Sequence, residues 1–310
     1  MSVVVVDDEP TAEQTSTAKP TGRKPRSAPA PMSASAAITV AVAVTLFAIA
    51  IWAILYAFTL SGIQEHSAQR GLYAKLRAEL ANEVAPVGGQ IKEGAPVALI
   101  NAPAIGLKDT VVVEGTSATD LQSGPGHQVN TVFPGQAGVS VIYGKSVTYG
   151  APFARVTSLR SGDQITATTG QGTFRYTVND VRRPGDPIPQ PLATGAGRLT
   201  LVAAVGSGWR RGWAPSQIVY VDASLVGRGK ASPSGGPTVQ PANQMSMARD
   251  DSALTPLVLW LELLVAGSVA FVWARRRWGS WQVWLVGTPA LLAVVWVVTE
   301  TAARLLPNLL

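Results

Sequence analysis

The sequence predicts a mainly β globular domain outside the cytoplasm, carried by three transmembrane α-helices. Only 14% of the residues are charged and 47% are hydrophobic, whereas soluble domains carry about 25% charged residues. Three apolar runs are long enough for a bilayer core, which needs about 20 helical residues. Between the first and the second run, short β-branched segments alternate with Gly/Pro turns, a pattern typical of a barrel or sandwich.

The three apolar runs cover residues 36–60, 254–274 and 281–299. The first is uncharged and exceeds the roughly 7–15 apolar residues of a secretory signal, so it predicts an uncleaved signal anchor. The second contains one charged residue, Glu262. The third contains Pro289, which membrane helices tolerate when neighbours satisfy the freed carbonyl.

Basic residues beside these runs predict their orientation. Four lie before the first run (Lys19, Arg23, Lys24 and Arg26), and residues 275–277 between the second and third runs are all arginine. Short cytoplasmic segments carry an excess of Lys and Arg. We therefore expect a plasma-membrane protein whose N-terminus is cytoplasmic and whose segment 61–253 lies outside the cytoplasm.

The remaining segments complete the expected organisation. Seven short runs are predicted strands: 97–100, 110–114, 138–143, 164–169, 174–178, 198–203 and 217–221. The predicted domains are a disordered cytoplasmic tail (1–35), an amphipathic helix and connector (61–95), the β domain (96–225), a flexible linker (226–253), a cytoplasmic Arg-rich loop (275–280) and a short external tail (300–310).

Composition excludes several kinds of chemistry. The chain has no cysteine and two histidines, His66 and His127, so disulfides, thiolate zinc sites and cysteine nucleophiles are excluded. No spacing of carboxylates predicts a metal site or cofactor. No interleaving of basic and aromatic residues predicts nucleic-acid binding. We expect His66 to be solvated and His127 to be a turn residue bonded to backbone.

Short motifs in the β domain carry a resemblance to a known family. In chain order they are Ala-Pro-Ala-Ile-Gly-Leu (102–107), Val-Glu-Gly-Thr (113–116), Gly-Pro-Gly-His (124–127), Phe-Pro-Gly-Gln (133–136), Thr-Tyr-Gly-Ala-Pro-Phe (148–153), Ser-Gly-Asp (161–163) and Arg-Leu-Thr-Leu-Val (198–202). In this order, residues 97–225 resemble a sortase domain of the class found in high-GC Gram-positive bacteria, the Actinobacteria. The resemblance implies an eight-stranded β-barrel.

The resemblance also implies a chemistry from which this chain departs. Sortases cut a sorting motif of the Leu-Pro-x-Thr-Gly kind with a cysteine, opposite a histidine, and an arginine stabilises the oxyanion. At the matching positions this sequence has Ala204 for the cysteine, Lys145 for the histidine and Gln217 for the arginine. Arg210 and Arg211, in the preceding loop, are alternatives for the arginine's place.

Without a thiolate, the sequence predicts that the chain is not an enzyme but a catalytically inactive, sortase-like binding or scaffold subunit in a membrane complex. Its groove can hold an extended peptide, and its spans suggest another membrane or cell-surface protein as partner. The candidate partner-binding residues are Glu262, Lys145, Arg210 and Arg211.

Two alternative functions, and two possible roles for Glu262, stay open at this point. Lys145 can serve as a base for Ser146 or Ser207, as in Ser-Lys hydrolases, or the barrel can be a structural spacer without a ligand. Glu262 lies about 12 Å below the outer end of its helix. A carboxylate at that depth needs a proton or a cation, so it either bonds within the bundle, to Thr288 or Tyr56, or meets a partner.

Overall fold

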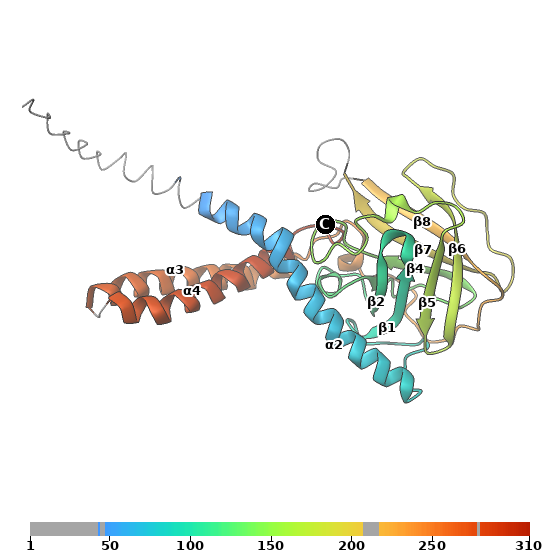
Figure 1. The fold of residues 1–310 in the computed structure, drawn as a ribbon, viewed down its shortest axis with the longest axis horizontal. Helices are drawn as coiled ribbons and strands as arrows, with labels where there is room; N and C mark the ends of the chain where they lie inside the picture. Colours follow the sequence, from blue (N-terminus) through green and yellow to red (C-terminus); the bar gives the residue numbers. More distant parts are fainter. Residues whose placement is uncertain (1–42, 44–46, 207–216, 278–279) are drawn as a thin grey trace, which may run out of the picture. The chain divides into compact units, whose positions relative to one another are not determined.

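The computed structural model describes residue 43 and residues 47–206, 217–277 and 280–310. The chain divides into two units, residues 1–47 and 48–310. In the first unit the described residues, 43 and 47, are helical. The second unit holds the β-barrel and the long helices, which Figure 1 labels.

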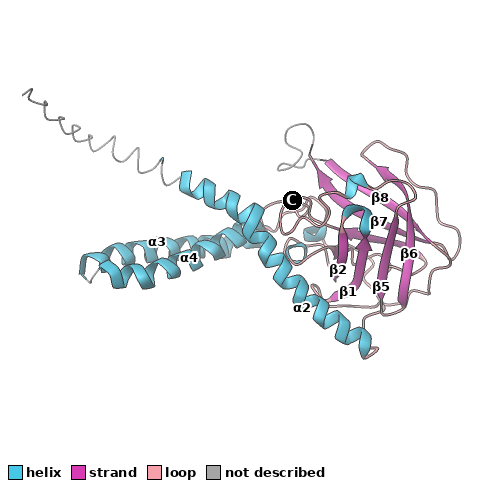
Figure 2. Cartoon of the chain, in the orientation of Figure 1, coloured by secondary structure: helices cyan, strands magenta, loops and turns pink. Residues whose placement is uncertain are grey.

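Eight strands close into a barrel in the order β1-β2-β3-β4-β7-β8-β6-β5, drawn in magenta in Figure 2. The strands are β1 (Pro96–Ala102), β2 (Leu107–Glu114), β3 (Gly126–His127), β4 (Gly138–Tyr143), β5 (Gln164–Thr169), β6 (Gly172–Arg182), β7 (Gly197–Val205) and β8 (Gln217–Leu225). The predicted fold class, a sortase-like eight-stranded barrel with three membrane-length helices, is confirmed.

All seven predicted strands are present, most of them longer by a few residues than their β-branched cores. No pattern in the sequence indicated β3, because a two-residue strand inside a Gly-Pro-Gly-His turn is too short to show alternation. β3 runs parallel to β2 and antiparallel to β4, so it closes the gap between these two strands. Barrel closure thus depends on a pairing that periodicity does not reveal.

Parallel pairing of β4 with β7 fixes the geometry of one barrel end. Their register runs from Gly138 opposite Gly197 to Tyr143 opposite Val202. β8 runs antiparallel to β7, so that it starts where β7 ends. The C-terminal ends of β4 and β7 and the first residues of β8 therefore lie side by side.

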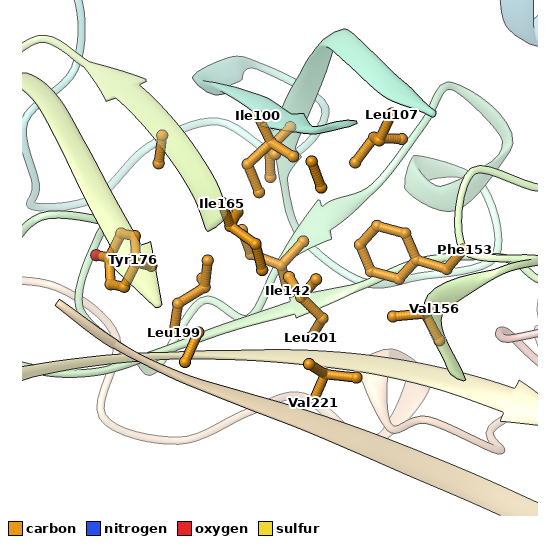
Figure 3. Packing of buried hydrophobic residues seen from close by; sticks show 14 of the residues in the cluster. Ile100, Leu107, Ile142, Phe153, Val156, Ile165, Tyr176, Leu199, Leu201 and Val221 are labelled. Carbon is orange, nitrogen blue, oxygen red and sulfur yellow. The ribbon is translucent and has the colours of Figure 1, made fainter. Parts of the chain in front are cut away.

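Alternating apolar side chains from all the long strands fill the barrel (Figure 3). Ile100, Ile142, Ile165 and Leu199 are each fully buried. Burying a side chain of this size stabilises a fold by about 1.5–3 kcal/mol. Tyr176 is also buried, and its hydroxyl accepts a hydrogen bond from the Gly135 backbone N–H. Apolar burial is thus the main force that holds the strands together.

Within the described residues, three helices are long and apolar enough to cross a membrane: Phe47–Ala81, Asp251–Arg275 and Trp281–Ala303. The first contains a π-helical stretch, η1 (Tyr56–Leu60), followed by α2 (Ser61–Ala81). The other two are built on α3 (Leu254–Arg277) and α4 (Ser280–Ala303), which lie side by side in Figure 1. The predicted first span and amphipathic helix therefore form one continuous helix in their described part.

α2 contacts the barrel through one buried leucine and through the hydrogen bonds of one glutamine. Leu76, one of the leucines that predicted this helix, is 2% exposed. The Gln69 amide group donates to the carbonyls of Val111 and Ser123, and its oxygen accepts from the Val111 N–H. The helix that contains α2 is thus hydrogen-bonded directly to β2.

Residues 226–253, predicted as a flexible linker, contact the barrel at several positions. The Lys230 N–H donates to the Gly135 carbonyl. Gln244 is fully buried: its carbonyl accepts from the Thr116 hydroxyl, and its amide donates to Glu93. These bonds hold the segment against the domain at two separate places.

Candidate functional site

The candidate site lies at the barrel end where β4 and β7 finish together. The Gly144 N–H donates to the Val202 carbonyl at 3.0 Å, which extends the β4–β7 pairing by one residue. Lys145 and Ser146 follow at once, and the Ser146 hydroxyl donates a short hydrogen bond to the Ala204 carbonyl. Residues almost sixty positions apart in the chain therefore meet at one place.

Of the three positions that match the sortase cysteine, histidine and arginine, the structure buries two. Ala204 is fully buried on β7, opposite Ile218 of β8, and Lys145 is only 2% exposed. Gln217, at the start of β8, pairs with Val205 but is exposed. Arg210, Arg211 and Ser207 lie outside the described residues.

Lys145 is a buried amine with uncommon partners. Its Nζ donates to the main-chain oxygen of Leu310 at 2.7 Å and lies 5.4 Å from the ring centroid of Tyr149. Among the described residues, no carboxylate side chain lies within ion-pair distance of it. Burial therefore lowers the pKa of Lys145 to about 7, because desolvation penalises the charged form.

The site is occupied by residues 304–310, which follow α4 and which we call the groove segment. Leu309 is fully buried in a cluster with Leu121, Tyr143, Val202 and Ala204. The Thr148 hydroxyl donates to the same Leu310 oxygen as Lys145, at 2.6 Å. Two donors thus converge on one main-chain oxygen, while the preceding side chain fills an apolar pocket beside Ala204.

The groove segment is a feature that sequence reasoning missed, since residues 300–310 were expected to form an external tail. One signal was available. The segment reads Arg-Leu-Leu-Pro-Asn-Leu-Leu, and four leucines in seven residues are unusual for a solvated tail. Its docking place could not be read from that composition.

His127 has both ring nitrogens engaged. Nδ1 lies 2.8 Å from the Glu114 carboxylate and Nε2 lies 3.0 Å from the Val132 carbonyl. The expected backbone bond is present, and the carboxylate is an addition that joins β3 to β2. Because neither nitrogen is free, His127 is placed to stabilise the barrel rather than to transfer protons.

Glu262 is exposed on α3, and no hydrogen bond or ion pair reaches it from the described part of the chain. Tyr56, one of the two internal partners considered for it, instead bonds to Gln64 and Tyr149. The other, Thr288, is half-buried on α4. Among the described residues, no three His, Asp or Glu side chains gather where they could hold a metal ion.

The comparisons agree with the geometry of this barrel. Residues 100–203 match the family model described as Sortase domain. Sortase D of Bacillus subtilis (strain 168) is 36% identical over 67 residues, which are 22% of this chain and 32% of that protein. The chain therefore matches about a third of the length of this curated relative. The barrel of this protein is a sortase domain.

Similar solved structures are sortases as well. A Clostridium perfringens sortase D5 transpeptidase is 25% identical with a TM-score of 0.42, covering 52% of this chain and 99% of that one. Sortase E from Streptomyces avermitilis is 26% identical with a TM-score of 0.36, covering 50% of this chain and 100% of that one.

These comparisons correct one expectation drawn from the sequence, that the chain is not an enzyme. The matching family model and the curated relative are sortases, an enzyme family, and the expectation of inactivity rested only on the missing cysteine. The absence of cysteine excludes a thiolate nucleophile. It does not exclude acyl transfer by another group, since hydroxyl nucleophiles activated by a base perform the same class of reaction.

Proposed function

We propose that this protein is a membrane-anchored sortase-family protein whose site at Lys145, Thr148 and Ala204 binds an extended peptide at the cell surface. The observation that carries the proposal is the occupied groove. Lys145 and Thr148 both donate to one main-chain oxygen, and the neighbouring Leu309 side chain is buried beside Ala204.

This arrangement suits peptide recognition for physical reasons. Main-chain hydrogen bonds supply affinity without regard to sequence, whereas side-chain pockets supply specificity. The amine and the hydroxyl are both buried, so leaving them without an acceptor would cost about 1–3 kcal/mol each. A peptide carbonyl satisfies both. The small side chain of Ala204 leaves room for an apolar side chain of leucine size.

The first prediction concerns this binding. Lys145→Met and Thr148→Val, each made in a chain that also carries Leu309→Asp so that its own residues 304–310 do not occupy the site, should each weaken the binding of a fluorescent peptide with the sequence of residues 304–310 in detergent. We expect a loss of about 10-fold or more, because a buried peptide oxygen that loses a hydrogen-bond donor costs about 1–3 kcal/mol. Fluorescence anisotropy measures the affinity. Lys75→Met, at an exposed lysine of α2, is the matched control. Unchanged affinity in both site variants would contradict the proposal.

A second candidate function is acyl transfer with Ser146 as nucleophile and Lys145 as base. The observation in its favour is that Lys145, whose pKa is about 7, directly precedes Ser146, whose hydroxyl donates to the Ala204 carbonyl, and an unprotonated amine can activate a hydroxyl. A fluorophosphonate probe should then label the full chain at Ser146, and label neither Ser146→Ala nor Lys145→Met. An unlabelled wild-type chain that leaves Leu-Pro-x-Thr-Gly peptides uncut would remove this candidate.

Two basic clusters support an orientation in which the barrel lies outside the cytoplasm of a plasma membrane. A cysteine introduced at the exposed Ser234 should therefore react with a membrane-impermeant thiol reagent on intact cells. A cysteine at Ser280, next to the arginines of residues 275–277, should react only after the cells are opened. The natural chain has no cysteine, so the reagent can react only with the introduced thiol. Labelling at position 280 on intact cells would reverse the proposed orientation.

Glu262 supports a membrane partner. An exposed carboxylate within an apolar helix costs a few kcal/mol unless a donor or cation meets it, and a neighbouring membrane protein can supply that group. We expect Glu262→Gln to reduce co-purification of such a protein, and Glu262→Leu to reduce it further, while the melting temperature of the isolated chain stays unchanged. A lower melting temperature with every co-purified protein retained would show instead that Glu262 serves the chain's own stability.

A further inference from the structure

The groove segment is held by main-chain contacts as well as by Leu309. Residues 240–250, which lead into α3, form a strap beside it. The Asn308 side-chain amide donates to the carbonyls of Asn243 and Met245, both at 2.8 Å, and the Asn308 N–H donates to the Ala248 carbonyl. Asn308 is fully buried as a result.

The segment uses the groups that an external peptide would need. Lys145 and Thr148 each bond to its Leu310 oxygen. Its Leu309 side chain fills the pocket beside Ala204. Because two chains cannot occupy one pocket or share these donors, an incoming peptide has to displace residues 308–310.

The segment is also joined to the membrane helices. It follows α4 directly, and the Asp250 N–H, just before α3, donates to the Arg304 carbonyl. Near its end, α4 is tied to the first helix, because Trp52 donates to Thr299 and Gln64 donates to Glu300. The groove segment is therefore linked to the helical hairpin by a short stretch of chain and by hydrogen bonds.

We infer that the groove segment is a tethered competitor that keeps the peptide site closed, and that the site takes peptides with a leucine-sized apolar residue directly before the residue whose main-chain oxygen Lys145 and Thr148 bind. This inference rests on the peptide-binding function proposed above. It adds a regulatory state in which the membrane hairpin controls access.

The tether makes this competition effective. A ligand joined by a short linker acts at an effective concentration in the millimolar range. The apparent affinity for a free ligand falls in proportion to the fraction of sites that are open. Weakening the segment should therefore tighten peptide binding, although no residue that touches the free peptide has changed.

The test measures binding of a fluorescent peptide of residues 303–310 to the full chain in detergent. Leu309→Asp, which places a charge in the apolar pocket, should release the segment and tighten peptide binding at least 10-fold. Leu306→Asp is the matched control, since Leu306 is 41% exposed, and it should change the affinity less than 2-fold. A peptide in which the leucine equivalent to Leu309 is aspartate should not bind either chain.

A second measurement does not depend on a charged substitution. In the Leu309→Cys variant the only thiol of the chain replaces a fully buried side chain, so it should react slowly with a thiol reagent. Added peptide should raise its rate at least 10-fold in a saturable manner. The thiol of Ser234→Cys should react quickly with or without peptide.

The outcomes separate this inference from the proposed function. If the peptide binds and Lys145→Met weakens it, but neither Leu309→Asp nor the thiol at position 309 responds, the segment does not compete and the inference is overturned while the binding function stands. If no peptide binds to any variant, including Leu309→Asp, both are overturned.

Discussion

Lys145→Met should make the full chain more stable than the wild type at neutral pH, with an advantage that disappears as the pH approaches 10.5. The unfolded lysine keeps its proton up to its ordinary pKa of 10.5, whereas burial lowers the pKa in the folded protein to about 7. Between these values the unfolded state binds more protons, so wild-type stability rises with pH. At about 1.4 kcal/mol for each pKa unit, the full difference is on the order of 5 kcal/mol.

Thermal melts of the full chain in detergent, recorded at several pH values between about 6.5 and 9.5, measure this effect, because the contribution of Lys145 to stability changes between its folded pKa of about 7 and its ordinary pKa of 10.5. Below about pH 7 the amine is charged in the folded and the unfolded protein, so the full free-energy cost of burying its charge is present. Lys75→Met is the control, because the Lys75 side chain is 56% exposed and its removal should give a curve parallel to the wild type. If the curve of stability against pH for Lys145→Met also ran parallel to the wild-type curve, the amine would be solvated or paired in the folded protein, and the prediction would be wrong.

Glu114→Ala should destabilise the barrel by about 1–3 kcal/mol, the usual loss when a buried polar group is left without its hydrogen-bond partner. The Glu114 carboxylate is 3% exposed and His127 is fully buried, with 2.8 Å between Oε2 and Nδ1. Alanine leaves that ring nitrogen without an acceptor in a site that excludes water. For a domain of this size, the melting temperature should fall by up to about 10 °C.

The comparison for this prediction is Glu79→Ala. Glu79 lies 3.9 Å from Lys75 in an i,i+4 pair on α2, and such surface pairs contribute about 0.3–0.5 kcal/mol. Replacing both members of the buried pair, Glu114→Leu with His127→Leu, should restore part of the stability, since no buried polar group of the pair is then left without its partner. A loss below about 1 kcal/mol for Glu114→Ala would mean that water replaces the carboxylate.

The expectation that the chain is not an enzyme was wrong because it rested only on the missing cysteine. The surroundings of a residue matter as well as its identity, and Lys145 is an example. The structure buries it, which brings its pKa to about 7, so its acid–base behaviour near neutral pH differs from that of an exposed lysine. Residue identity at a site position does not determine chemistry when the surroundings shift the protonation state.

The sequence by itself determined the barrel and the helices of membrane length. These depend on local patterns: alternating β-branched residues between turns for β4 and β5, whose bounds were predicted without error, and long apolar runs for α3 and α4. Local patterns encode local structure because neighbours along the chain share one face or one bilayer depth.

Only the tertiary structure decided what lies in the groove. Lys145, Ala204 and Leu309 are widely separated in the sequence, and they meet because β4 pairs in parallel with β7 and because the chain folds back after α4. Neither the fully buried state of His127 and Glu114 nor the occupied site follows from any periodicity. Such contacts depend on which apolar and polar surfaces are left to be covered once the barrel has closed, and that is a property of the assembled fold.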